Sequence, residues 1–141
     1  MTDTAQPTPE ELLARARTIA VVGFSSDPAK PSHSAPMELV NHGWQVIPIN
    51  PTVEEVAGLR AYPALADVPV PIDIVDVFRP AAEAPEIARQ AAAAGAGALW
   101  LQLGITSDEA RAIAGDAGMS YVEDLCAGAL ARRAELHPAQ P

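Results

Sequence analysis

Short apolar runs alternate with helix-like segments along most of this chain. The first run, residues 18–22, is apolar at successive positions and consists largely of β-branched residues. This pattern is typical of a strand that is buried on both faces of a sheet. The runs predict strands at 18–22, 44–49, 72–78, 98–102 and 121–122. The segments between them carry helix-start signals and much alanine, and they predict helices over about 8–17, 32–42, 82–94, 106–117 and 124–135.

A regular alternation of strand and helix favours a parallel sheet with helices on both faces. We therefore expect an α/β fold: a Rossmann-like, doubly wound parallel sheet of five strands in a single domain. The domain is expected to span 8–137, with disordered tails at 1–7 and 138–141. Residues 52–71 read as an irregular connection, with one helical turn near 54–57 and a second at 64–67.

Several helix starts carry side chains that cap exposed backbone amides. The expected N-caps are Thr8, either Ser32 or Ser34, Thr106 and Asp124. Glu11 and Glu109 each stand three residues after a threonine, so we expect a capping box at both places.

The composition of the chain argues against several classes of binding partner and site. The formal net charge of −9 and the pI of about 4.6 argue against nucleic acid and against anionic membrane surfaces. A single cysteine, Cys126, leaves no internal disulfide, and we expect no metal site. The chain has no apolar run long enough for a membrane span, and residues 1–6 do not resemble a secretory signal, so we expect a cytoplasmic protein.

Candidate binding residues follow the predicted strands, because ligands of such sheets bind at the carboxyl ends of the strands. The residues that we assign to a cofactor site are Gly23, Phe24, Ser25, Ser26, Lys30, Ser32, Asn50, Pro51, Phe78, Arg79, Pro80, Gln102 and Gly104. Cations, hydroxyls, amides and an aromatic ring suit a phosphate-bearing ligand with an adenine ring better than an acid–base active site. We assign no catalytic residue.

The glycine loop differs from the dinucleotide fingerprint. That motif needs three closely spaced glycines and an acidic residue after the second strand. Here no glycine follows Gly23 until Gly43, and Asn50 stands where the acid would be. Both departures count against an NAD(P)-dependent enzyme, which stays open as an alternative together with a scaffold subunit regulated by its ligand. Gly23 taken alone is also explained by a tight turn.

Five separated motifs resemble the CoA-binding domain family, the small stand-alone proteins related to the CoA-binding domain of the succinyl-CoA synthetase α subunit. The motifs lie at 19–25, 30–32, 46–51, 73–79 and 99–104, and the similarity covers about 15–133. The resemblance implies coenzyme A or an acyl-CoA as the ligand. It leaves open whether the partner is a second copy of the chain or an enzyme.

The resemblance also implies a role for each part of the site. The loop from Gly23 to Ser26 would contact the phosphates, with Lys30 as the cationic partner. The segments 50–51 and 78–80 would flank the nucleotide or the start of the pantetheine arm, and Gln102 and Gly104 would complete the rim.

Asp76 has a structural interpretation, whereas His33 and Cys126 have two interpretations each. Asp76 lies in an apolar strand, so we expect it to be buried and bonded to a backbone amide or a basic side chain. His33 either meets a phosphate or is a surface histidine near a helix start. Cys126 either forms a mixed disulfide with the CoA thiol or packs as a small apolar residue.

Overall fold

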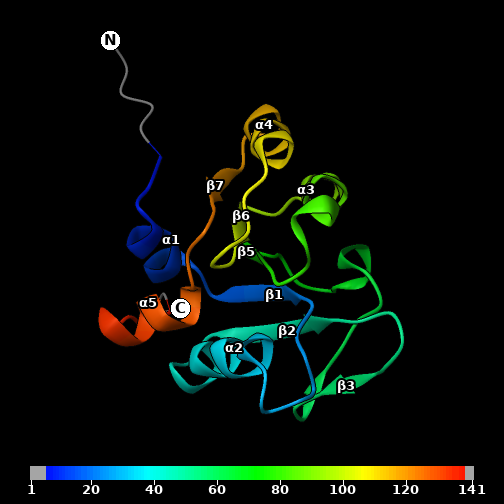
Figure 1. Cartoon of the computed structure of the whole chain (residues 1–141), viewed down its shortest axis with the longest axis vertical. Coiled ribbons are helices and arrows are strands. Elements are labelled where there is room, and N and C mark those ends of the chain that lie inside the picture. The colour runs from blue at the N-terminus through cyan, green and yellow to red at the C-terminus, as the bar shows by residue number, and fades with distance from the viewer. Residues whose placement is uncertain (1–5, 139–141) are drawn as a thin grey trace.

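The computed structural model describes residues 6–138, so the outer parts of both predicted tails, 1–5 and 139–141, lie outside the described residues. Five parallel strands form the main sheet in the order β2-β1-β5-β6-β7 (Figure 1). The strands are β1 (Thr18–Val22), β2 (Gln45–Ile49), β5 (Ile74–Val77), β6 (Ala98–Leu101) and β7 (Ser120–Val122). The prediction of a single, doubly wound α/β domain is confirmed.

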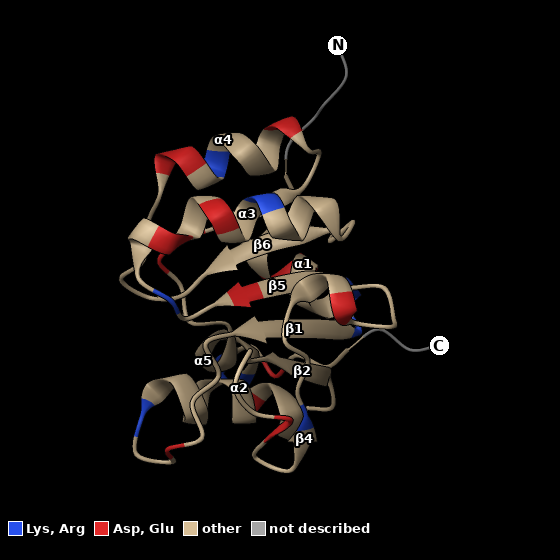
Figure 2. Ribbon diagram, turned by 90° about the vertical axis from the view of Figure 1, so that its right-hand side faces the viewer, with Lys and Arg blue, Asp and Glu red and all other residues tan. Residues whose placement is uncertain are grey.

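Helices cover both faces of this sheet. Helices α1 (Pro9–Arg15), α2 (Pro31–Asn41) and α5 (Ala127–Arg133) lie on one face, and α3 (Ala84–Ala93) and α4 (Asp108–Asp116) lie on the other. Figure 2 shows α3 and α4 on one side of the strands and α2 and α5 on the opposite side. No helix of the described chain has both the length and the apolar character that a membrane crossing requires.

The order of the strands creates a switch point between β1 and β5. The chain leaves β1 through α2 to reach β2, and it then crosses back past β1 to add β5, β6 and β7 on the other side. At such a point the loops after the two central strands diverge, which leaves a crevice at the carboxyl edge of the sheet.

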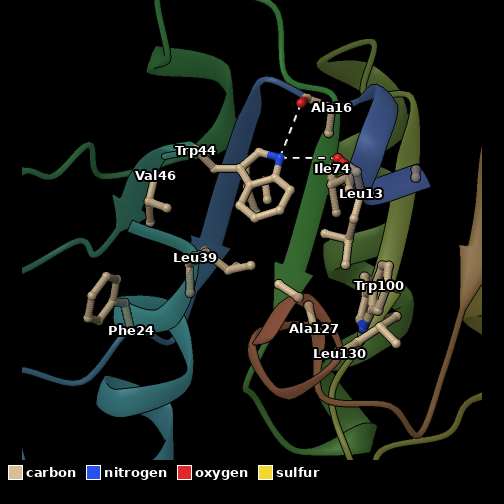
Figure 3. Packing of buried hydrophobic residues seen from close by; sticks show 14 of the residues in the cluster. Leu13, Ala16, Phe24, Leu39, Trp44, Val46, Ile74, Trp100, Ala127 and Leu130 are labelled. Carbon is tan, nitrogen blue, oxygen red and sulfur yellow. Dashed lines mark hydrogen bonds between the residues drawn. The ribbon is translucent and has the colours of Figure 1, made fainter. Parts of the chain in front are cut away.

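Two tryptophans anchor the core on the face of α1, α2 and α5 (Figure 3). The indole nitrogen of Trp44 donates to the carbonyl oxygens of Leu13 and Ala16, at 3.1 Å each. The indole nitrogen of Trp100 donates to the carbonyl oxygen of Leu125 at 2.8 Å. Each ring is therefore buried without an orphaned N–H group, and this layer holds the sheet against the N-terminal helix.

The crossover from β2 to β5 differs in part from the prediction. In place of a helical turn near 54–57, a hairpin joins β3 (Glu55–Val56) to β4 (Leu59–Arg60). Its two turn residues, Ala57 and Gly58, have φ values of +53° and +79°. Two successive positive φ values suit a tight hairpin turn and are incompatible with a helix. The second predicted turn is confirmed as the 3₁₀ helix η1 (Leu65–Asp67).

The helix caps are partly as expected. Thr8 and Glu11 form the predicted capping box on α1. The prediction for α2 was wrong, because Pro31 takes the first helical position and Lys30 is the N-cap, without a side-chain hydrogen bond. Ser107 caps α4 by accepting from the Ala110 amide at 3.1 Å.

Two further cap predictions were wrong. Glu109 does not close a box with Thr106, because the N-cap of α4 is Ser107 and Ala110 is therefore the third helical residue; the Glu109 carboxylate accepts from Arg89 at 2.8 Å. Asp124 has a φ of +56° and lies before the cap position of α5, which Cys126 occupies. The Asp124 carboxylate instead accepts from the Gly104 amide at 2.7 Å and ties the β6–α4 loop to the end of β7.

Candidate functional site

A pocket of about 650 Å³ opens at the switch point, beside the carboxyl ends of β1 and β2. Four of the sequence-predicted site residues line it: Gly23, Asn50, Pro51 and Arg79. The remaining wall comes from the crossover at 63–64, from the 3₁₀ helix η2 (Ala81–Glu83) and from one side of α3. Its volume lies within the range of pockets that hold small ligands, roughly 300–1,000 Å³.

Gly23 allows the loops after β1 and β5 to approach each other. Its φ is +94°, and an added Cβ would lie 3.0 Å from Cδ of Arg79 and 3.3 Å from the carbonyl carbon of Phe78. A side chain at this position would therefore be strained by its backbone and would also press on the neighbouring loop. The glycine thus fixes the shape of the crevice, as a turn and as a point of close approach.

The β1–α2 loop, residues 23–30, is closed by its own hydrogen bonds. The Ser25 amide donates to the carbonyl oxygen of Ser32 at 3.0 Å, and the Asp27 amide donates to the Ser25 hydroxyl at 3.1 Å. The Asp27 carboxylate in turn accepts from the Ala29 amide at 3.0 Å. This internal bonding holds the loop in one shape ahead of α2.

Part of the same loop is left without internal partners. The amides of Gly23, Phe24 and Ser26 donate to no acceptor within residues 6–138. Ser26 and Lys30 are exposed, and Lys30 is the single lysine of the chain. Free amides that precede a helix of 11 residues form a region of positive potential in an otherwise acidic protein.

Arg79 is paired within the pocket. Its Nε donates to Oε1 of Glu83 at 3.0 Å, and its Nη2 donates to Oε2 of the same carboxylate at 2.9 Å. This two-point contact raises the pKa of Arg79 and lowers the pKa of Glu83. Both side chains are about half exposed, at 49% and 45%. The guanidinium is therefore held by a carboxylate and at the same time open to solvent.

Asn50 is partly used by its own turn. Its side-chain oxygen accepts from both the amide and the hydroxyl of Thr52, at 2.9 Å each. Its backbone amide donates to Tyr62, which brings the crossover against the end of β2. The side-chain amide group of Asn50 keeps its donors on a residue that lines the pocket.

Other predicted residues lie near the edge without lining the pocket. The Phe24 ring is 3% exposed and belongs to the core, where it meets the His33 ring edge-on at 5.7 Å. Phe78 is half-buried against the same cluster, and Pro80 is exposed at the start of η2. Contact of these residues with a ligand stays a prediction, and for Phe24 only the backbone is available to it.

Gln102 is a buried residue rather than part of an open rim, since only 4% of it is exposed. Its side-chain nitrogen donates to Oδ1 of Asp76, which is 1% exposed. Burial raises the pKa of the Asp76 carboxyl to about 7, against a smaller opposing effect of the Gln102 hydrogen bond. Oδ2 of Asp76 has no hydrogen-bond partner among the described residues. Asp76 is buried as predicted, but its partner is a side-chain amide.

Two further residues have local partners. Nδ1 of His33 lies 2.7 Å from the carbonyl oxygen of Ser25, so the imidazole braces the β1–α2 loop from the first turn of α2. Sγ of Cys126 accepts from the Ala129 amide at 3.4 Å and caps α5. Neither contact tests the alternative readings, a phosphate partner for His33 and a mixed disulfide for Cys126.

Sequence reasoning missed the part of the pocket that α3 and the preceding turn provide. Glu83, Glu86, Ile87 and Gln90 line it. Their spacing of three, four and seven residues is that of one helical face, so the face next to Arg79 could have been found from helical periodicity. The wall at 63–64 has no comparable signal, because the crossover lacks regular structure there.

A family model described as "CoA binding domain" matches residues 17–132, and the chain belongs to this family. The protein YneT of Bacillus subtilis is 36% identical over 117 residues, which cover 83% of this chain and 87% of YneT. A solved structure of a hypothetical protein from Pyrococcus horikoshii has 33% identity and a TM-score of 0.84, and the match covers 94% of this chain and 98% of that one.

A much longer enzyme also contains a similar region. The ADP-forming acetate–CoA ligase II of Archaeoglobus fulgidus is 27% identical over 108 residues. The match covers 74% of this chain but only 15% of the ligase. The chain therefore corresponds to one small part of that enzyme.

Proposed function

We propose that this protein binds coenzyme A or an acyl-CoA, with the diphosphate on the β1–α2 loop and the adenosine in the adjoining pocket. The observation that carries the proposal is the β1–α2 loop, which adjoins the pocket through Gly23 and whose Gly23, Phe24 and Ser26 amides have no acceptor among residues 6–138, at the switch point of a CoA-binding-domain chain. Ligands of doubly wound sheets bind at this point.

Local electrostatics favour a diphosphate at the loop in spite of the net charge of −9. The free amides and the N-terminal end of α2 both carry positive partial charge, and they lie close together because the Ser25 amide donates to the Ser32 carbonyl oxygen in the first turn of α2. Lys30, the N-cap residue of α2, adds a mobile cation. Ser25 and Ser26 add hydroxyl donors. These groups act at contact distance, whereas surface carboxylates more than a Debye length away, about 8–10 Å, are largely screened by salt.

The lining of the pocket suits the adenosine moiety of the proposed ligand. Pro51, Pro63, Ala64 and Ile87 supply apolar walls, and Asn50 supplies amide donors for a ring nitrogen. A mostly apolar cavity with a few polar groups is the usual arrangement for a ligand of this kind.

The proposed role is binding without catalysis. In the acetate–CoA ligase the similar region forms about 15% of the protein, and we assign to this chain the binding step alone. An enzyme that uses the ligand, or a second copy of the chain, is the proposed protein partner. The single cysteine suits the reducing environment of the cytoplasm, where we place the protein.

Isothermal titration calorimetry with CoA, dephospho-CoA and NAD tests the proposal. We expect measurable binding of CoA and none of NAD. Lys30→Ala should weaken CoA binding by roughly 1–3 kcal/mol, the loss of a charge-assisted phosphate contact. Arg133→Ala, at the end of α5, removes the same charge from an exposed site and should leave the affinity unchanged. Binding of NAD but not of CoA would contradict the proposal and favour the dinucleotide enzyme.

A further inference from the structure

The Arg79–Glu83 pair holds the guanidinium that the pocket offers to a ligand. Among the described residues that line the pocket, Arg79 is the single cation, and Glu83 and Glu86 are the carboxylates. Glu83 occupies one edge of the guanidinium, accepting from Nε at 3.0 Å and from Nη2 at 2.9 Å, so an anionic ligand that approaches this edge must replace the carboxylate. The pocket is therefore not a simple cationic site.

We propose that Arg79 and Glu83 form an exchangeable pair, in which a phosphate group of the bound nucleotide takes the guanidinium from Glu83. This inference rests on the proposed function, because it assigns a phosphate-bearing ligand to the same pocket. Glu83 then acts as a specificity residue. A ligand that brings a phosphate to Arg79 replaces the carboxylate, whereas one without a phosphate leaves the pair intact and gains nothing from the cation.

The exchange is physically accessible because the pair is about half exposed, at 49% and 45%. An ion pair between exposed side chains contributes little to stability, and a phosphate can form the same two-point contact with a guanidinium that a carboxylate forms. The stem of Arg79 lies against Gly23, where an added Cβ would be 3.0 Å from Cδ. The guanidinium therefore starts beside the loop to which the diphosphate is assigned.

Glu83 keeps a favourable position once it is released. It is the N-cap residue of α3, where the helix dipole stabilises a negative side chain. Its carboxylate makes no capping hydrogen bond while it holds Arg79. Near this end of the helix the dipole partly compensates the charge of a released carboxylate, even though the Ala84 amide already donates to Ala81 and Pro85 has no N–H group.

Glu86 provides a matched control. It lines the same pocket, but it pairs with Arg89 at 3.2 Å and not with Arg79. Glu86→Gln removes the same negative charge from the pocket wall without releasing the guanidinium. The difference between Glu83→Gln and Glu86→Gln thus isolates the exchange from the general loss of repulsion.

The test is calorimetric titration of CoA and dephospho-CoA into the wild type, Glu83→Gln and Glu86→Gln, and into Arg79→Ala alone and combined with each of these two changes. We expect Glu83→Gln to tighten CoA binding by about two- to five-fold, clearly more than Glu86→Gln does. In the Arg79→Ala background the advantage of Glu83→Gln over Glu86→Gln should disappear. A gain with CoA alone identifies the 3′-phosphate as the group that is read, and a gain with both ligands identifies the diphosphate.

An equal gain in both Glu→Gln variants, or no gain in Glu83→Gln, would overturn the exchange while wild-type CoA binding leaves the proposed function standing. A weaker affinity of Glu83→Gln would mean that Glu83 positions Arg79 for the ligand, and this too would overturn it. Absence of CoA binding by the folded wild type would overturn the proposed function and the exchange together.

Discussion

Asp76→Asn tests the cost of a carboxyl group in the centre of the sheet. Asp76 is 1% exposed on β5, and its Oδ2 has no partner within the described chain. Burial raises its pKa from 3.8 to about 7. One pKa unit corresponds to about 1.36 kcal/mol, so ionising Asp76 in the folded protein costs roughly 4 kcal/mol.

The sign of the pH dependence follows from the direction of this shift. Between about pH 4 and 7 the folded state holds a proton on Asp76 that the unfolded state has released. The contribution of Asp76 to the free energy of unfolding is therefore complete below pH 4 and is lost as the pH rises toward 7. Asn is neutral at every pH, so the Asp76→Asn variant should not lose stability in this way. At pH 8 its free energy of unfolding should exceed that of the wild type by about 2–4 kcal/mol.

Urea unfolding followed by circular dichroism at several pH values from 4 to 8 measures both quantities. Asp116→Asn, which changes an exposed carboxylate at the end of α4, is the control and should keep the slope of the wild type. Equal slopes for Asp76→Asn and the wild type, with Asp76→Asn less stable at pH 8, would refute the reasoning.

Three glycine substitutions test the packing of the loops and helices. Gly23→Ala should destabilise the fold by roughly 1–3 kcal/mol and weaken CoA binding, because the φ of Gly23 is +94° and the added Cβ would meet Arg79. Thermal melts measure the stability and titrations measure the affinity, and an unchanged melting temperature would contradict the prediction. Gly128→Ala should unfold more easily, because its Cβ would lie 2.3 Å from the carbonyl oxygen of Ala35 in α2. Gly115→Ala, with open space around it, should instead raise stability by about 0.5–1 kcal/mol, and a similar loss in both variants would refute the packing argument.

The main sheet could be predicted because its strands are short apolar runs with clear ends. The strand 18–22 has the same bounds in the structure as in the prediction. The hairpin at 55–60 could not be predicted, because Glu55–Val56 and Leu59–Arg60 are too short to show an alternating pattern. The hairpin depends on the positive φ of Ala57, a conformation that alanine rarely adopts.

The candidate site could be predicted only as far as strand ends define it. Gly23, Asn50, Pro51 and Arg79 line one pocket because parallel strands deliver their carboxyl ends to one edge. The sequence does not reveal the rotation of each residue about that edge. Gln102 therefore turns inward to Asp76 although it directly follows β6, and its direction is determined by burial of the carboxyl group.

The two faces of the sheet are packed differently. Helices α1, α2 and α5 form a close layer with the two tryptophans, and Gly128 allows α5 to touch α2. On the other face α3 and α4 pack over the sheet, and the crossover meets the end of β2 through Ile49 and Tyr62. The pocket lies between this crossover, η2 and α3, beside the β1–α2 loop.

A crystal structure of the protein grown with saturating CoA tests the central claim most directly. The account predicts the diphosphate within hydrogen-bonding distance of the amides of Gly23, Phe24 and Ser26, with Lys30 turned toward it. The adenine ring should lie in the pocket between Pro51 and Ile87. Coenzyme A bound at another surface, or a loop that stays empty while the crystals hold CoA at saturation, would contradict the account.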